Sequence, residues 1–263
     1  MKVDGPGNGR GDVPVITDVR QSGDVKPGAV ILVSGPLDPA DWWNHEGDSP
    51  NRPGFPVITP VDACHAPPFS VAWIASVAQH LQLAAPADPL VVVGHGSAGP
   101  LLPALARTQR AGGRHIAGYV FVDATLPRPG PTSHLDLLKA AAPDEERLAH
   151  EHLHAPGGVW PALADSEKPF PGESRGTVPH TAQGPAQGLP QARPRDHQFW
   201  SETLPPAIDW PDAPCAYVHT GQPAPGCGDV DFWARSARSR GWPVTEEPDP
   251  LQGVRASLDH LPG

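Results

Sequence analysis

One stretch decides the fold of this chain, Leu90-Val91-Val92-Val93-Gly94-His95-Gly96-Ser97-Ala98-Gly99-Pro100-Leu101-Leu102-Pro103. Its first four residues are aliphatic, and a continuous apolar run of this length is typical of a strand buried on both faces of a parallel sheet. Gly94 stops the run, and a helical pattern begins at Leu101, directly after a turn rich in glycine. The stretch therefore predicts a buried strand that turns sharply into a helix.

The same alternation extends outward from this stretch. Apolar runs that predict further strands lie at residues 29–33, 118–122 and 215–218, with residues 55–58 as an additional candidate. Residues 71–83 place apolar side chains at three- and four-residue spacing, which predicts an amphipathic helix. Strands that alternate with helices predict the α/β class, with a parallel sheet and crossover helices.

The length and composition of the chain indicate how many domains to expect. The chain has 263 residues, with 28 glycines and 37 prolines, a share that approaches that of disordered proteins. The hydrophobic set nevertheless makes up 38% of the residues and includes eight tryptophans, which is enough for one buried core. We expect a single domain that carries an insertion.

Composition shifts along the chain predict its organisation. We expect a flexible N-terminal segment at residues 1–24, and an α/β core formed by residues 25–126 and 210–263. Residues 127–209 read as an inserted lid that begins with one helix-like piece. Within the lid, residues 155–195 are dense in proline, glycine, glutamine and charge, so this part buries too little apolar surface to offset its ordering entropy.

Charge and cysteine content exclude several classes of protein. The formal net charge is −10, and no cluster of Lys and Arg forms a basic stripe, so we expect neither a nucleic acid nor an anionic membrane as partner. No apolar run suits a secretory signal or a membrane span, which predicts a soluble, cytoplasmic protein. Cys64, Cys215 and Cys227 are odd in number and lack metal-type spacing, which argues against a disulfide framework or a zinc ribbon.

Residues 90–103 resemble the nucleophile elbow of the α/β-hydrolase superfamily. Within it the chain is similar to small actinobacterial hydrolase-like proteins, whose elbow reads Gly-His-Ser-Gly-Ala-Gly-Pro-Leu-Leu-Pro. Residues 120–124, 210–217 and 241–244 fit the same group. The resemblance implies an α/β-hydrolase fold: a mostly parallel central sheet, flanking helices and an inserted, partly irregular lid. It also implies a catalytic serine, histidine and acid.

The chain departs from that pattern at two positions. Aligned through its flanking residues, the elbow places Gly96 at the nucleophile position and brings the serine one residue later, at Ser97. In the alternative register Ser97 is the nucleophile, and His95 then crowds the turn two residues before it. The family histidine would fall near Leu251, and His260 is the only histidine beyond that point. A serine without a positioned base is a weak nucleophile.

The remaining parts of such a site have candidates. Asp123 ends a predicted strand, where it could orient a histidine or cap the next turn. The turn after the first strand corresponds to the loop that supplies one oxyanion donor. Pro36 has no N–H, so the resemblance leaves the N–H groups of Leu37 and Ser97 as donors when Gly96 is at the nucleophile position.

Residues 150–154 form a competing motif, because their order matches the zinc-binding pattern His-Glu-x-x-His. The third ligand of the extended motif would stand at position 160, which is Trp160, and Pro156 ends the helix at once. We interpret the motif as the exposed polar face of a lid helix, and we expect neither a metal nor a cofactor.

Trp42 and Trp43 follow the oxyanion-type loop and suit an apolar ligand cavity. We therefore expect an α/β-hydrolase-like protein that binds or acts on an apolar small molecule, its Ser/His triad lost or displaced. Such a protein could catalyse a non-hydrolytic reaction such as elimination, cyclisation or isomerisation. One alternative is a serine esterase that uses Ser97 with His95 or His219; another is a non-catalytic ligand-binding protein. The candidate site residues are Ser97, His95 and Asp123 for catalysis, and Leu37, Gly96, Trp42 and Trp43 for the oxyanion and ligand pocket.

Overall fold

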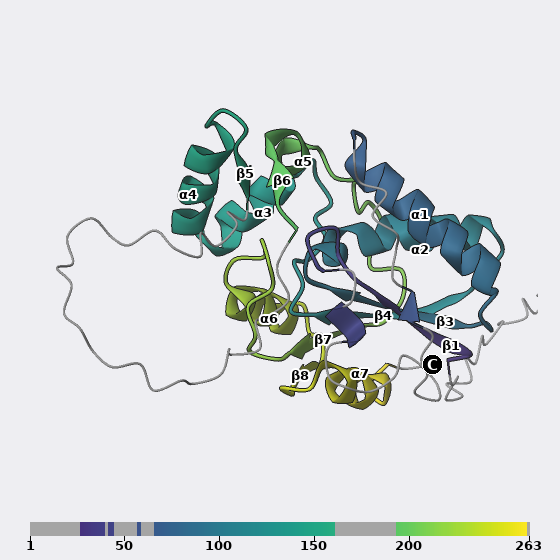
Figure 1. Cartoon of the computed structure of the whole chain (residues 1–263). Helices are drawn as coiled ribbons and strands as arrows, with labels where there is room; N and C mark the ends of the chain where they lie inside the picture. The colour runs from purple at the N-terminus through teal and green to yellow at the C-terminus, as the bar shows by residue number, and fades with distance from the viewer. Residues whose placement is uncertain (1–26, 40–41, 45–56, 59–65, 161–192, 262–263) are drawn as a thin grey trace, which may run out of the picture.

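The centre of the protein is a parallel sheet, seen in a computed structural model that describes residues 27–39, 42–44, 57–58, 66–160 and 193–261 (Figure 1). Within these ranges the sheet has six strands in the order β2-β1-β3-β4-β7-β8, and each pair of neighbours is parallel. The strands are β1 (Ala29–Val33), β2 (Val57–Ile58), β3 (Leu90–His95), β4 (Ile116–Val122), β7 (Cys215–His219) and β8 (Val244–Glu246).

Continuous apolar sequence explains the inner strands. Every residue of β1 and β3 is buried, and so is all of β4 except Ala117. A strand covered on both faces has no solvent side, so it shows no alternation of polar and apolar residues. The strands predicted at residues 29–33, 90–93, 118–122 and 215–218 are confirmed, and β2 covers residues 57–58 of the candidate at 55–58, whose first two residues lie outside the described ranges. Three of them are longer than predicted: β3 continues to His95, β4 starts at Ile116, and β7 reaches His219.

Two hydrophobic clusters lie on opposite faces of the sheet. Ile31, Val92 and Phe121 face the larger cluster, which α1 (Phe69–Ala84), α2 (Leu102–Ala111) and α6 (Val230–Ser239) cover. Val30 and Val91 face the smaller cluster, closed by α7 (Pro250–Leu258) and Trp43. The α/β class predicted from the sequence is therefore confirmed as a three-layer arrangement (Figure 1).

The chain between β4 and β7 carries the predicted lid. Its described elements are α3 (His134–Ala141), α4 (Pro143–Leu153), β5 (Val159–Trp160), β6 (Arg195–Asp196) and α5 (His197–Ser201), and Figure 1 shows its helices grouped beside one end of the sheet. The single helix-like piece expected here is in fact two helices. Proline has no N–H to continue a helix, and Ala142 before Pro143 has a non-helical backbone (φ −148°, ψ 79°).

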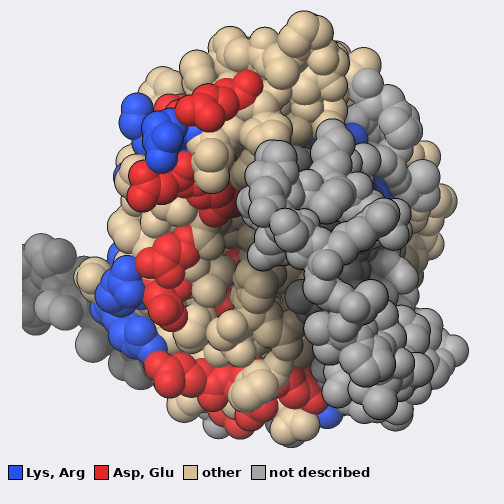
Figure 2. Space-filling view, turned by 60° about the vertical axis from the view of Figure 1, so that its left-hand side comes forward, with Lys and Arg blue, Asp and Glu red and all other residues tan. Residues whose placement is uncertain are grey.

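Some predictions fall on residues outside the described ranges. These are the N-terminal segment at residues 1–24 and most of the irregular stretch at residues 155–195, of which residues 161–192 are not described. None of the described helices is both long and apolar enough to cross a membrane. Figure 2 shows Asp and Glu side chains spread over one face of the molecule, with Lys and Arg gathered in smaller groups, in keeping with the net charge of −10.

Candidate functional site

The sharp turn after β3, called the elbow from here on, has glycine at its tip. Gly96 has φ +54°, in the left-handed region that glycine adopts without strain. It begins the 3-10 helix η2 (Gly96–Leu101), which leads into α2. The next loop packs closely on this turn: Thr125 N–H donates to the Gly96 carbonyl (3.2 Å), and a Cβ at Gly99 would lie 2.0 Å from the Thr125 carbonyl oxygen. The sharp turn is therefore present, but its tip carries no side chain.

The hydroxyl group of Ser97 faces the loop that follows β1. Ser97 is 1% exposed, and its Oγ accepts a hydrogen bond from Leu37 N–H (3.0 Å). A Cβ at Gly35 would lie 2.3 Å from this Oγ, so the two loops are in contact. The bond uses Leu37 N–H, one of the two predicted oxyanion donors. Among the described residues, no histidine side chain hydrogen-bonds to the Ser97 hydroxyl.

A buried carboxylate and imidazole lie beside the elbow. Asp38 Oδ2 accepts a hydrogen bond from Gly35 N–H and lies 2.9 Å from His95 Nδ1. Both side chains are almost completely buried. The acidic partner places the imidazole proton on Nδ1, which leaves Nε2 with a free lone pair in the neutral ring. Asp38 therefore fixes both the orientation and the tautomer of His95.

The two tryptophans predicted for the pocket lie against this pair. Trp42 stacks on the His95 ring, with centroids 3.4 Å apart and planes inclined by 17°. Trp43 packs edge-on against Trp42 (4.6 Å, 89°) and is buried in the smaller core cluster. Trp42 thus covers one face of the imidazole, while Trp43 supports Trp42 from the core.

Asp38 also occupies the space above the tip of the elbow. A Cβ built on Gly96 would lie 2.9 Å from Asp38 Oδ1, closer than ordinary contact allows. Asp38 is not among the site residues predicted from the sequence. One signal could have found it: a carboxylate in the loop after a central strand lies at the carboxyl edge of the sheet, where α/β folds place their ligands.

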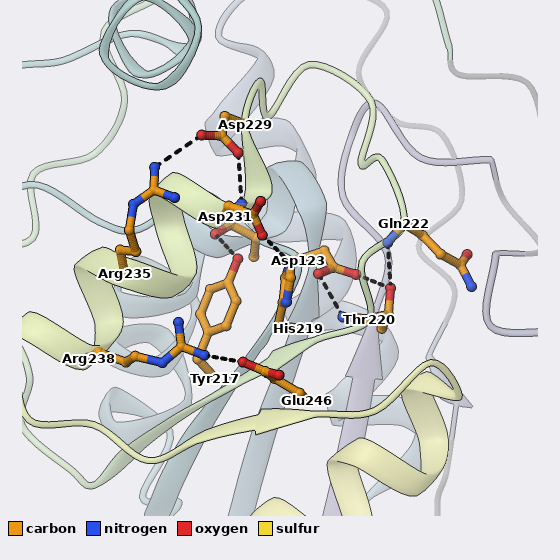
Figure 3. A network of polar contacts seen from close by, with 11 residues as sticks. Asp123, Tyr217, His219, Thr220, Gln222, Asp229, Asp231, Arg235, Arg238 and Glu246 are labelled. Carbon is orange, nitrogen blue, oxygen red and sulfur yellow. Dashed lines mark hydrogen bonds and ion pairs between the residues drawn. The ribbon is translucent and has the colours of Figure 1, made fainter.

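Asp123 holds two loops together. It ends β4 in a left-handed conformation (φ 43°), and its carboxylate accepts hydrogen bonds from both the N–H (3.0 Å) and the hydroxyl of Thr220, after β7 (Figure 3). Burial raises the pKa of Asp123, although the Thr220 bonds oppose that shift. The sequence predicts that Asp123 orients a histidine or caps the next turn. Its described hydrogen bonds serve neither purpose, because they reach across to the neighbouring strand end.

The other positions considered for a histidine base are His219, Leu251 and His260. His219 Nε2 is 3.0 Å from Asp231 Oδ1, as Figure 3 shows. Leu251, at the position of the family histidine, lies on α7 and packs against the smaller core cluster. His260 is exposed near the end of the described chain. None of the three is hydrogen-bonded to Ser97 in the part of the chain that the structure describes.

The His-Glu-x-x-His motif lies on α4, in the lid. The rings of His150 and His154 stack on each other (4.0 Å between centroids), and Glu151 lies 3.9 Å from Arg147. Across the described ranges, no group of three or more His, Cys, Asp or Glu side chains is arranged to hold a metal ion. The cysteines in these ranges, Cys215 and Cys227, are buried and unpaired, while Cys64 lies outside them.

Solved structures identify the architecture. The chain resembles an extracellular α/β-hydrolase from a Paenibacillus species, described as sharing structural and functional homology with tobacco salicylic acid binding protein 2 (TM-score 0.51, 18% identity, covering 89% of this chain and 96% of that one). It also resembles a pyrethroid hydrolase from Sphingobium faniae JZ-2 (TM-score 0.51, 16% identity, 88% and 97%). The chain has the α/β-hydrolase fold.

The likeness shows the fold alone at this level of identity. The sequence matches no protein-family model and no curated protein. The roles of Gly96, Ser97, Asp38 and His95 in this α/β-hydrolase fold therefore rest on their own geometry.

Proposed function

We propose that this α/β-hydrolase-fold protein binds an apolar small molecule beside the elbow and catalyses a non-hydrolytic proton transfer, with His95 as the base and Asp38 as its orienting partner. Elimination, cyclisation and isomerisation are reactions of this kind. One observation carries the proposal: the tip of the elbow is Gly96, while the neighbouring serine hydroxyl is held by Leu37 N–H.

This arrangement disfavours an acyl-enzyme mechanism. A serine attacks a carbonyl when a base within about 2.6–3.2 Å removes its proton. Ser97 Oγ instead accepts a hydrogen bond from Leu37 N–H, and this bond withdraws electron density from the oxygen. The same bond uses the N–H that would stabilise an oxyanion. The covalent route therefore lacks an activated nucleophile, and Leu37 N–H, the oxyanion donor predicted with Gly96 at the nucleophile position, is already engaged.

The Asp38–His95 pair supports proton transfer. With Nδ1–H bonded to the carboxylate, His95 Nε2 can accept a proton, and the imidazolium formed is stabilised by the adjacent Asp38 charge. An apolar molecule bound at the common edge of the stacked Trp42 and His95 rings would contact both the indole and the imidazole. Base and apolar surface are thus adjacent.

A fluorophosphonate probe tests the loss of the serine step. We expect no labelling of the wild-type chain above that of Ser97→Ala, because the probe needs an activated serine. Strong labelling that disappears in Ser97→Ala would refute the proposal and favour a serine esterase.

The elimination of 5-nitrobenzisoxazole tests the base. In this reaction a base removes the ring C–H proton, the N–O bond breaks, and a coloured cyanophenolate is released, so no nucleophile or cofactor is needed. We expect catalysis above buffer that falls about a hundredfold or more in His95→Gln and is retained in Ser97→Ala. Equal rates for wild type and His95→Gln would contradict the role of His95 and favour the non-catalytic alternative.

A further inference from the structure

One oxygen of the Asp38 carboxylate is buried without a partner. Asp38 is 1% exposed, and its Oδ2 is engaged by Gly35 N–H and His95 Nδ1. Its Oδ1 has no hydrogen-bond partner among the described residues. A carboxylate oxygen that loses water without gaining a donor is costly, so native structures rarely leave one in this condition.

From this we infer that the ligand of the site carries a hydrogen-bond donor, a hydroxyl or an ammonium group, which binds Asp38 Oδ1 above Gly96. The inference rests on the proposed function, since it specifies the ligand of that same site. It describes the ligand as an otherwise apolar molecule, to suit Trp42, with one donating polar group.

Gly96 borders this oxygen and adds no side-chain atoms beside it. A Cβ at position 96 would lie 2.9 Å from Oδ1, so any other residue would place carbon atoms where a donor must sit. Glycine therefore keeps the tip of the elbow from covering this side of the carboxylate. The position also lies at the carboxyl edge of β1 and β3, where open parallel sheets bind their ligands.

Two hydroxyl groups on the loops beside the elbow also lack a described hydrogen-bond partner. Ser34 Oγ and Thr125 Oγ1 are buried and have no hydrogen-bond partner among the described residues. Ser34 precedes Gly35, whose N–H binds Asp38, while Thr125 N–H binds the Gly96 carbonyl. Buried polar atoms without a described partner thus occur on both loops beside the elbow.

The charge around Asp38 is compatible with either donor. The described ion-pair partner of Asp38 is His95, whose ring is neutral when Nε2 acts as a base. The pair then carries the negative charge of the carboxylate. A hydroxyl would form a charge-assisted hydrogen bond with Oδ1, and an ammonium group would add an ion pair.

Three probes that share one apolar body test the inference on the wild-type chain: naphthyl-ethanol, naphthyl-ethylamine and the methyl ether of naphthyl-ethanol. Calorimetric titration gives the dissociation constant of each. We expect the alcohol or the amine to bind about tenfold or more tightly than the ether, because the ether has no proton to donate to Oδ1. Equal binding of all three, or no saturable binding of either donor, would overturn the inference.

Asp38→Asn sharpens the test. The Gly35 and His95 donors hold an oxygen at the Oδ2 position, so the amide nitrogen of asparagine takes the Oδ1 position and presents N–H groups to the ligand. The preference for the alcohol over the ether should then disappear, because both oxygens can accept a hydrogen bond from the amide N–H, and the ammonium of the amine should bind most weakly. Asp144→Asn is the matched control, since Asp144 is 98% exposed on α4, and it should keep the wild-type preference.

The outcomes separate this inference from the proposed function. Donor preference is measured by binding alone and needs no catalysis, whereas the proposed base is measured by 5-nitrobenzisoxazole turnover. Tighter binding of the donor probes without turnover of 5-nitrobenzisoxazole would support the inferred ligand class and contradict His95 as the base. Turnover without tighter binding of the donor probes would support His95 as the base and contradict the ligand class.

Discussion

Replacing Gly96 by alanine should destabilise the fold through two separate effects. The left-handed backbone at φ +54° costs an L-residue about 1–2 kcal/mol. The added methyl group would lie 2.9 Å from Asp38 Oδ1, and forcing extra volume into a packed site costs roughly 1–3 kcal/mol. We therefore expect Gly96→Ala to lower the free energy of unfolding by about 2–5 kcal/mol, measured by guanidinium denaturation followed by tryptophan fluorescence.

Gly241→Ala separates the two effects. Gly241 is also left-handed (φ +75°), but no described atom lies within 4 Å of the position that an added Cβ would take, so this variant should lose only the backbone share, about 1–2 kcal/mol. In an Asp38→Ala background, Gly96→Ala should likewise lower the free energy of unfolding only by the backbone cost. Gly96→Ala and Asp38→Ala would then show a coupling energy of roughly 1–3 kcal/mol in a double-mutant cycle. Additive effects, or equal losses for Gly96→Ala and Gly241→Ala, would refute the contact between Gly96 and Asp38.

Three further predictions concern elements around the site. The Glu202 carboxylate accepts two backbone N–H groups at the start of α1 (2.6 and 2.7 Å), so Glu202→Gln should lower the free energy of unfolding by about 1 kcal/mol in a denaturant titration. Burial lowers the pKa of His134 from 6.5 to about 4. The neutral ring's contribution to the free energy of unfolding is therefore full above pH 6.5 and is lost as the pH falls through 4. In His134→Phe, the fall in the free energy of unfolding between pH 6.5 and 4 should be smaller by roughly 3 kcal/mol, measured by denaturation at a series of pH values. Burial raises the pKa of Asp123 above 3.8. The protonated group's contribution to the free energy of unfolding is therefore full below pH 3.8 and is lost as the pH rises through its pKa in the folded protein. Asp123→Asn should not show this loss in the same series of denaturation measurements.

The sequence predicted the inner sheet well, because burial on both faces leaves an unbroken apolar run. β1 has the predicted bounds, and the neighbouring strands differ from prediction only at their ends. β8 was not predicted, since it has three residues at the edge of the sheet and shows no such run. The break between α3 and α4 was also missed, although Pro143 marks it. Short edge strands and helix breaks depend on local tertiary contacts more than on periodicity.

The site was only partly predictable for a different reason. The sequence predicts Gly96 at the tip of the elbow, and Gly96 has a left-handed backbone. It also names His95 as a catalytic candidate and Trp42 and Trp43 as separate candidates for the pocket. It could not place Asp38 beside His95, because the two residues are 57 positions apart, and the loop that carries Asp38 meets the end of β3 only when β1 pairs with β3. A contact between two such distant side chains leaves no pattern in a single sequence.

The geometry of the elbow supports the proposal that Gly96, Asp38, His95 and Ser97 form one site. With no side chain at position 96, the Asp38 carboxylate can enter the space above the turn, and in that position it also meets His95 Nδ1. The serine one residue later points to the opposite loop, where it accepts a hydrogen bond from Leu37 N–H. A serine at position 96 would place its Cβ 2.9 Å from Asp38 Oδ1, and Leu251 would offer it no base. The contacts of Gly96, Ser97, Asp38 and His95 are compatible with one another, and together they support the proposed imidazole base over a serine nucleophile.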